Sequence, residues 1–133
     1  MLHSAGIESA IRVLLADDDR AFVESLRSLI EQQPELTVVG AACNGLEAIE
    51  LAESLGPDAV VIDLHMPLLD GVTAVARLRK DHPHLCLIAL TGDTSAALHR
   101  AVGEAGADAV LLKDELVHSL VDRLSAVKFT ASV

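Results

Sequence analysis

Short hydrophobic runs alternate along the chain with longer segments in which apolar residues recur every three or four positions. The runs are rich in Val, Leu, Ile and Ala and occupy residues 11–16, 36–42, 58–63, 85–91 and 108–113. Their length and composition predict five buried strands. The segments that follow the first four runs predict amphipathic helices, as the spacing of Phe22, Leu26, Leu29 and Ile30 illustrates.

A fifth helix is expected from about Glu115 to Val127, with Leu116, Leu120 and Leu124 on one face. Strict alternation of strands and helices predicts a single α/β domain, in which a five-stranded parallel sheet carries helices on both faces. The domain is expected to cover residues 10–128. Residues 1–9 and 129–133 are expected to be loose ends.

Composition and charge narrow the class of protein. Ten basic and twenty acidic residues give a net charge of -10, which argues against direct binding of nucleic acid by this domain. No apolar run approaches the roughly 20 residues of a membrane helix, and the start of the chain lacks the pattern of a secretory signal. A cytoplasmic location is therefore expected. Cys43 and Cys86 stand alone in the sequence and are expected to be buried, reduced thiols.

Acidic residues follow two of the predicted strands. Asp17, Asp18 and Asp19 come directly after the first strand, and the third strand ends on Asp63. In the flavodoxin-like strand order 2-1-3-4-5, the first and third strands are neighbours, so these carboxylates would share one crevice. Repulsion between like charges calls for a proton or a cation, and Mg2+ suits oxygen ligands of this kind. Asp19 is also placed to cap the helix that follows.

Two further polar residues end predicted strands on the same rim of the sheet. The fourth strand ends on Thr91 and the fifth on Lys113. A metal ion and an ammonium group can neutralise phosphoryl oxygens, while a hydroxyl group can donate a hydrogen bond to one of them. This combination predicts phosphoryl chemistry.

Four motifs in order, "ADDD" (16–19), "DLHMPLLDG" (63–71), "LTGD" (90–93) and "LLKD" (111–114), resemble the receiver domain of bacterial two-component response regulators. The resemblance extends over roughly residues 11–127. It implies a flavodoxin-like (βα)5 fold and a signalling role, in which a sensor histidine kinase or a phosphotransfer protein donates a phosphoryl group to an aspartate. On this basis the chain is expected to be a phosphoacceptor switch with intrinsic self-phosphorylation and slow autodephosphorylation, and not an enzyme.

The resemblance also assigns roles to individual residues. Asp63 would be the phosphoacceptor, and Thr91 and Lys113 would contact the phosphoryl oxygens. Asp18, Asp63 and the backbone carbonyl of His65 would bind Mg2+ (or Mn2+), and Asp17 would act through metal-bound water. The His65 side chain is expected to face solvent.

Two departures from the family pattern stand out. Asp114 follows Lys113 where proline is usual, and this "LLKD" variant is similar to receivers attached to helix-turn-helix DNA-binding domains. Val110 occupies a position at which many receivers carry Tyr or Phe. This suggests that phosphorylation is transmitted without an aromatic rotamer switch, by repacking of the fourth helix. A homodimer through the fourth and fifth helices is also consistent with the resemblance.

Two alternative functions remain open from the sequence. One is an atypical receiver that acts as an interaction module without phosphorylation, which the Val110 substitution favours and the complete acidic cluster disfavours. The other is a phosphohydrolase of the haloacid dehalogenase type, in which Asp17 would be the nucleophile of an Asp-x-Asp motif.

Overall fold

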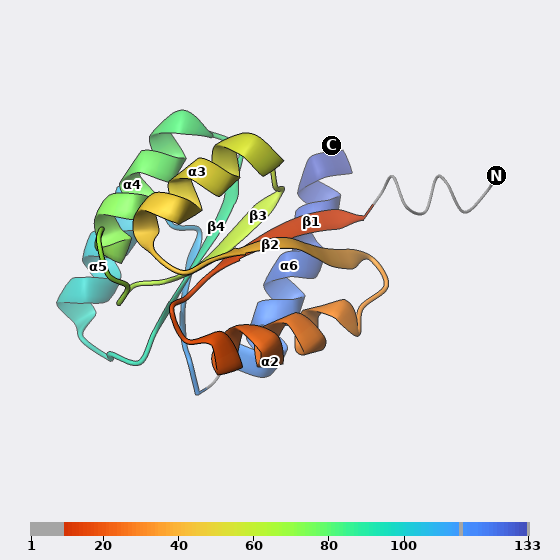
Figure 1. Ribbon diagram of the computed structural model, residues 1–133, viewed down its shortest axis with the longest axis horizontal. Coiled ribbons are helices and arrows are strands. Elements are labelled where there is room, and N and C mark those ends of the chain that lie inside the picture. Colours follow the sequence, from red (N-terminus) through yellow and green to blue (C-terminus); the bar gives the residue numbers. More distant parts are fainter. Residues whose placement is uncertain (1–9, 115, 133) are drawn as a thin grey trace.

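The computed structural model of the protein describes residues 10–114 and 116–132 (Figure 1). Its sheet consists of β1 (Ile11–Ala16), β2 (Leu36–Ala42), β3 (Ala59–Asp63), β4 (Cys86–Thr91) and β5 (Ala109–Leu112). The helices are α2 (Arg20–Glu31), α3 (Gly45–Leu55), α4 (Gly71–Asp81), α5 (Ala96–Ala105) and α6 (Leu116–Ser132). None of these helices combines the length and the apolar character needed to cross a bilayer.

All five strands are parallel and follow the order β2-β1-β3-β4-β5. This confirms the predicted flavodoxin-like α/β architecture. Figure 1 shows α3, α4 and α5 on one face of the sheet and α2 and α6 on the other. Right-handed crossover connections determine which face of the sheet each helix covers. Strand β2 lies on one side of β1 and β3 on the other, so the direction in which strands are added changes at β1.

Two hydrophobic cores lie on opposite faces of the sheet, because alternate residues of each strand point to opposite sides. Leu14, Val60 and Ile62 belong to the core beneath α3, α4 and α5, whereas Val13 and Val61 belong to the core beneath α2 and α6. All five side chains are at most 1% exposed. Burial of each such side chain stabilises the fold by about 1.5–3 kcal/mol, so the central strands form a firm base for the residues that follow them.

The last helix extends further than expected. It continues to Ser132 and does not end near Val127, so residues 129–132, expected to be a loose end, belong to the helix. The sequence has no Gly or Pro after Gly106, and without such a residue nothing local ends the helix. The expected loose ends at 1–9 and at 133 lie outside the described residues.

Candidate functional site

Asp17 and Asp63 lie side by side at the carboxyl edge of the sheet. Ala16 on β1 pairs with Ile62 on β3, so the residues that come next in each strand emerge at neighbouring positions. Both residues are almost completely buried, with exposed fractions of the whole residue of 4% for Asp17 and 3% for Asp63. Parallel pairing of two hydrophobic strands thus brings together carboxyl groups that are far apart in the sequence.

Asp18 completes a cluster of three carboxylates. Asp17, Asp18 and Asp63 can each offer one oxygen so that all three oxygens lie within 4.8 Å of one another. Asp18 is exposed, which opens the cluster to solvent. Asp19 does not join the cluster: it is the N-cap of α2, as predicted, and its side chain accepts a hydrogen bond from the Phe22 amide. Three negatively charged carboxylates, one of them accessible to solvent, suit a hard divalent cation.

The ammonium group of Lys113 partly balances these negative charges. Lys113 directly follows β5, and its Nζ atom lies 2.9 Å from Oδ2 of Asp17 and 3.4 Å from Oδ2 of Asp63. Partial burial alone would lower the pKa of Lys113, but the hydrogen bond to Asp17 and the charges of Asp63 and Asp17 outweigh it and raise the pKa. Lys113 is therefore a permanent cation at this rim.

Burial raises the pKa of Asp63, and the nearby charge of Asp17 raises it further. The backbone N–H of His65 donates a 3.1 Å hydrogen bond to Oδ1 of Asp63 and, with Lys113, opposes this rise. The carboxylate is thus poorly solvated but remains oriented by two donors. A poorly solvated, oriented carboxylate is a better nucleophile than one in bulk water.

Thr91 lies at the end of β4 and is fully buried. Its hydroxyl oxygen accepts a hydrogen bond of 2.9 Å from the Asp93 amide and lies 3.3 Å from Nε2 of His65. His65 is exposed, as expected, but its ring belongs to the site because its Nε2 atom contacts the Thr91 hydroxyl group. The sequence could not show this contact, since it depends on the path of the loop after β3.

The loop between β3 and α4 is held by close backbone packing. The Gly71 amide donates a 3.2 Å hydrogen bond to the Leu64 carbonyl, and a Cβ atom at Gly71 would come within 2.4 Å of the Leu64 Cα atom. Asp70 caps α4 by accepting a hydrogen bond from the Thr73 amide. Leu68 has a positive φ of 74°. The Asp-Gly pair thus starts a helix and fixes the loop that carries His65.

Phe22 was not singled out as a site residue by the sequence, yet it contacts Lys113. The Lys113 Nζ atom lies 4.4 Å from the centroid of the Phe22 ring, which is within the range of a cation–π interaction. Its helical spacing predicted that Phe22 faces the core, and the ring does pack at the margin of the core beneath α2 and α6. The spacing could not reveal that the lysine after β5 lies across from it.

Two other sequence-based expectations concern Val110 and the two cysteines. Val110 is partly buried and packs against the core beneath α3, α4 and α5, where no aromatic ring is present among the described residues. The expectation that both cysteines are buried is wrong: Cys43 is exposed and Cys86 is half-buried, although both are free thiols. Cys43 follows the end of β2, and both its amide and its thiol donate to Glu47, which holds the residue at the surface.

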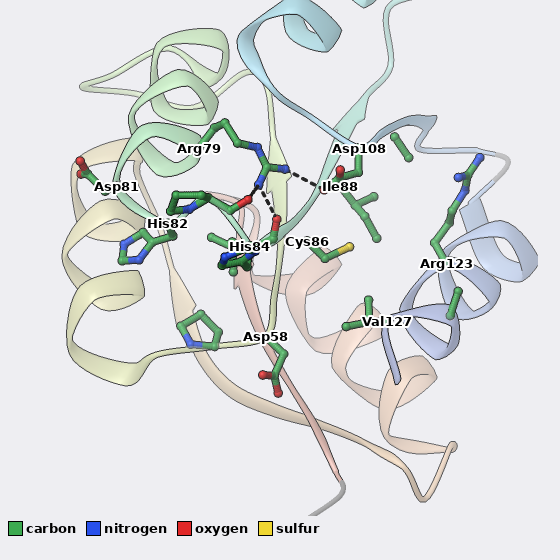
Figure 2. A pocket seen from close by; sticks show the side chains of 15 residues that line it. Asp58, Arg79, Asp81, His82, His84, Cys86, Ile88, Asp108, Arg123 and Val127 are labelled. Carbon is green, nitrogen blue, oxygen red and sulfur yellow. Dashed lines mark hydrogen bonds and ion pairs between the residues drawn. The ribbon is translucent and has the colours of Figure 1, made fainter. Parts of the chain in front are cut away.

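A hollow in the described surface lies at the opposite edge of the sheet. It has a volume of about 900 Å3 and includes residues at the amino ends of β4 and β5 (Figure 2). Arg79 crosses one side of it and is bound to Asp108 at 2.8 Å and to the carbonyl groups of Pro83 and Leu85. Because its guanidinium group is occupied by protein acceptors, we assign this residue a structural role. The carboxylate cluster at the other edge is the candidate functional site.

The chain resembles known proteins over most of its length. The family model described as "Response regulator receiver domain" matches residues 13–125. A protein-glutamate methylesterase/protein-glutamine glutaminase of Shewanella frigidimarina is 36% identical over 129 residues, which cover 89% of this chain and 32% of that protein.

Solved structures of two response regulators have the same fold. The response regulator domain of Thermotoga maritima CheB superposes with a TM-score of 0.80 at 30% identity and covers 90% of this chain and 96% of that chain. A LuxR-family two-component response regulator from Aurantimonas sp. SI85-9A1 gives a TM-score of 0.85 at 30% identity, with 91% of this chain and 86% of that chain covered.

The relatives correct one prediction from the sequence. We expected a switch that is not an enzyme, but the relatives are named as enzymes, methylesterases and glutaminases. The chain spans about a third of the length of these curated relatives. The four sequence motifs lie within the part that the chain shares with these relatives, so they carry no information about the activity that names the relatives.

Proposed function

The chain belongs to the response regulator receiver domain family and has a role in signal transduction, and we propose that Asp63 is its phosphoacceptor. The observation that carries this proposal is the placement of the buried Asp63 carboxylate beside the Asp17 carboxylate, with the Lys113 ammonium group in contact with both. The proposed donor is the phosphohistidine of a sensor histidine kinase or of a phosphotransfer protein.

In the proposed reaction, an oxygen of Asp63 attacks the phosphorus atom of the donor. A new O–P bond forms while the P–N bond to the donor imidazole breaks, and the imidazole nitrogen keeps the electron pair and then takes a proton. Lys113 neutralises one of the phosphoryl oxygens. The Thr91 hydroxyl group donates a hydrogen bond to another, once it has turned from its present contacts with Asp93 and His65. Attack by water on phosphorus later restores the Asp63 carboxylate and releases inorganic phosphate.

The carboxylate cluster fits Mg2+ (or Mn2+). Asp18, Asp63 and the backbone carbonyl of His65 would hold the ion, with Asp17 acting through bound water. When bound, such an ion neutralises negative charge on phosphoryl oxygens. The fit rests on the oxygen ligands and on the charge balance, because three clustered carboxylates face a single ammonium group.

Transmission of the signal would begin at Thr91. Its hydroxyl oxygen accepts from the Asp93 amide, and Asp93 in turn accepts from the Ser95 amide at the start of α5. A turn of Thr91 toward a phosphoryl group would therefore disturb the loop that enters α5. With Val110 in place of an aromatic residue, repacking of α5 is the proposed route to a changed interaction surface.

The output partner belongs to one of two classes. The names of the relatives favour control of a methylesterase or glutaminase, whereas the "LLKD" motif and the LuxR-family neighbour favour control of a DNA-binding domain. A homodimer through α5 and α6 is a further proposal. A cytoplasmic location stays a prediction.

Intact-mass measurement after incubation with acetyl phosphate and Mg2+ tests the proposal. We expect a gain of one phosphoryl group that disappears with EDTA and in Asp63→Asn. Asp81→Asn is a matched control: it makes the same chemical change at an exposed residue near the other edge of the sheet and should be phosphorylated normally.

Two outcomes would contradict the proposal. Loss of the adduct in Asp17→Asn together with its retention in Asp63→Asn would make Asp17 the nucleophile. A folded, Mg2+-binding protein that gains no phosphoryl group and does not bind beryllofluoride would be an atypical receiver that acts as an interaction module.

A further inference from the structure

The aromatic ring of Phe22 forms one side of the pocket around the Lys113 ammonium group. The Nζ atom is 4.4 Å from the ring centroid, while Asp17 and Asp63 contact the same atom at 2.9 and 3.4 Å. We infer that Phe22 is a positioning residue for phosphoryl transfer, because it holds the Lys113 ammonium over the crevice while the carboxylates change partners. This inference rests on the proposed role of Lys113.

Helix capping determines where the ring lies. Asp19 is the N-cap of α2 and accepts a hydrogen bond of 3.2 Å from the Phe22 amide, so Phe22 stands in the first turn of the helix. The start of α2 is therefore fixed close to the end of β1 and to Asp17. Phe22 packs at the margin of the core, next to buried side chains such as Val23, and remains half-buried.

The contacts of Lys113 differ in what the reaction does to them. The oxygens of Asp17 and Asp63 that now accept from Lys113 belong to the same carboxyl groups that a divalent cation and the phosphoryl group would engage. These contacts must weaken when the site is loaded. The ring face offers no lone pair to a metal ion or to phosphorus, so its attraction for the ammonium group can persist throughout the reaction.

Such a persistent contact matters because a lysine side chain is flexible. Its four-carbon stem loses rotamer entropy when the ammonium is fixed. The Lys113 side chain is 29% exposed, so solvent alone would let it move away from the rim. The ring limits this freedom and removes water from one side of the charge, which strengthens the attraction of the ammonium for a phosphoryl oxygen.

Initial rates of phosphorylation by acetyl phosphate with Mg2+ would test the inference in a series of variants. Phe22→Leu keeps an apolar side chain but removes the ring face, and we expect it to slow phosphorylation about two- to fivefold, as suits a partly exposed cation–π contact. Phe22→Trp should restore the wild-type rate or exceed it. Leu29→Ala is the control, since Leu29 is a half-buried residue of the same helix that belongs to the core margin and not to the site; it should lower stability without slowing the reaction.

A double-mutant cycle with Lys113→Met decides between positioning and simple packing. If Phe22 acts through the ammonium, Phe22→Leu will cause no further slowing in the Lys113→Met background. Equal slowing of phosphorylation by Phe22→Leu in both backgrounds would overturn the inference and leave the proposed function intact. A wild-type rate for Phe22→Leu, when Lys113→Met is slow, would have the same meaning. A wild-type rate for Lys113→Met would instead overturn the proposed role of the lysine, and the inference with it.

Discussion

The ammonium group of Lys113 donates a 2.9 Å hydrogen bond to Oδ2 of Asp17, although the two residues are 96 positions apart in the chain. Only 2% of the Asp17 side chain is exposed, so this bond neutralises a charge that water cannot reach. Asp63 contacts the same ammonium group at 3.4 Å, and Asp18 adds a third carboxylate to the cluster. The site therefore keeps an excess of negative charge, and a bound cation should stabilise the fold.

Magnesium ions should raise the free energy of unfolding in a way that depends on Asp18. At a concentration one hundred times its dissociation constant, an ion that binds only the folded state adds about 2.7 kcal/mol. Asp18→Asn should remove most of this gain, yet change stability without the ion by no more than about 0.5 kcal/mol, because the side chain is exposed. Urea unfolding followed by circular dichroism, with MgCl2 or EDTA, measures both. A full magnesium effect in Asp18→Asn, with Asp81→Asn as the control, would contradict the assigned ligand.

The charge of Asp63 should destabilise the metal-free protein at neutral pH. Since burial raises the pKa of Asp63 in the folded state, the folded protein holds this proton more tightly than the unfolded chain. The stabilising effect is fully present below the ordinary aspartate pKa and is lost as the pH rises through the raised value. Asp63→Asn should therefore be more stable than wild type by about 1 kcal/mol at pH 7.

The difference in stability between wild type and Asp63→Asn should shrink as the pH is lowered through the raised pKa. Below that value the wild-type carboxyl group is protonated, so it is as neutral as the amide group of the variant. Urea unfolding at a series of pH values in EDTA gives the result. A difference that grows on acidification would show that the pKa of Asp63 is lowered by folding and not raised.

Hydrophobic periodicity was sufficient to predict the fold. Val60, Val61 and Ile62 are buried on both faces of the sheet, and such continuous apolar runs are what parallel strands require. Their spacing in the chain left little alternative to a doubly wound sheet. The ends of elements were harder to predict: α6 continues to Ser132 because no local signal stops it, and Cys43 lies beyond the last buried residue of β2.

The site was predictable only where residues lie at strand ends. Asp17, Asp63, Thr91 and Lys113 all come together once the strand order is known. Contacts made by side chains from helices and loops, such as that of Phe22 with Lys113, depend on helix position and loop path. No periodicity in the sequence encodes these distances.

Gly71 should be intolerant of even a methyl group. A Cβ atom there would lie 2.4 Å from the Leu64 Cα atom and 2.9 Å from its carbonyl oxygen, so the backbone between Asp63 and His65 would have to move. We expect Gly71→Ala to lose about 1–3 kcal/mol of stability and to slow phosphorylation. Thermal unfolding and intact-mass rates with acetyl phosphate measure the two effects.

Gly103→Ala provides the matched control for this substitution. Gly103 lies within α5 and has open space around its Cβ position, so alanine should stabilise the helix by about 0.5–1 kcal/mol without a change in the phosphorylation rate. Equal behaviour of the two alanine variants would mean that the loop after β3 is not held by the close approach of Gly71 to Leu64.

Arg79 should be needed for stability but not for phosphorylation. Its guanidinium group donates to the carbonyl groups of Gly106, Pro83 and Leu85 at 2.8–2.9 Å and to Asp108 at 2.8 Å. These bonds join α4 to the segments that enter β4 and β5. A lysine has a single ammonium group and cannot reach four acceptors in different directions, so Arg79→Lys should lose about 2 kcal/mol.

The same substitution on the exposed face of α4 separates geometry from charge. Arg77→Lys keeps the charge at an exposed position and should change stability by no more than about 0.5 kcal/mol. Both variants should gain a phosphoryl group from acetyl phosphate at the wild-type rate when assayed well below their melting temperatures, because the Arg79 network lies at the opposite edge of the sheet from Asp63. Equal stability of the two lysine variants would show that the hydrogen bonds of the Arg79 guanidinium group stabilise the fold no more than a point charge does. Slow phosphorylation of Arg79→Lys alone would show that the two edges of the sheet are coupled.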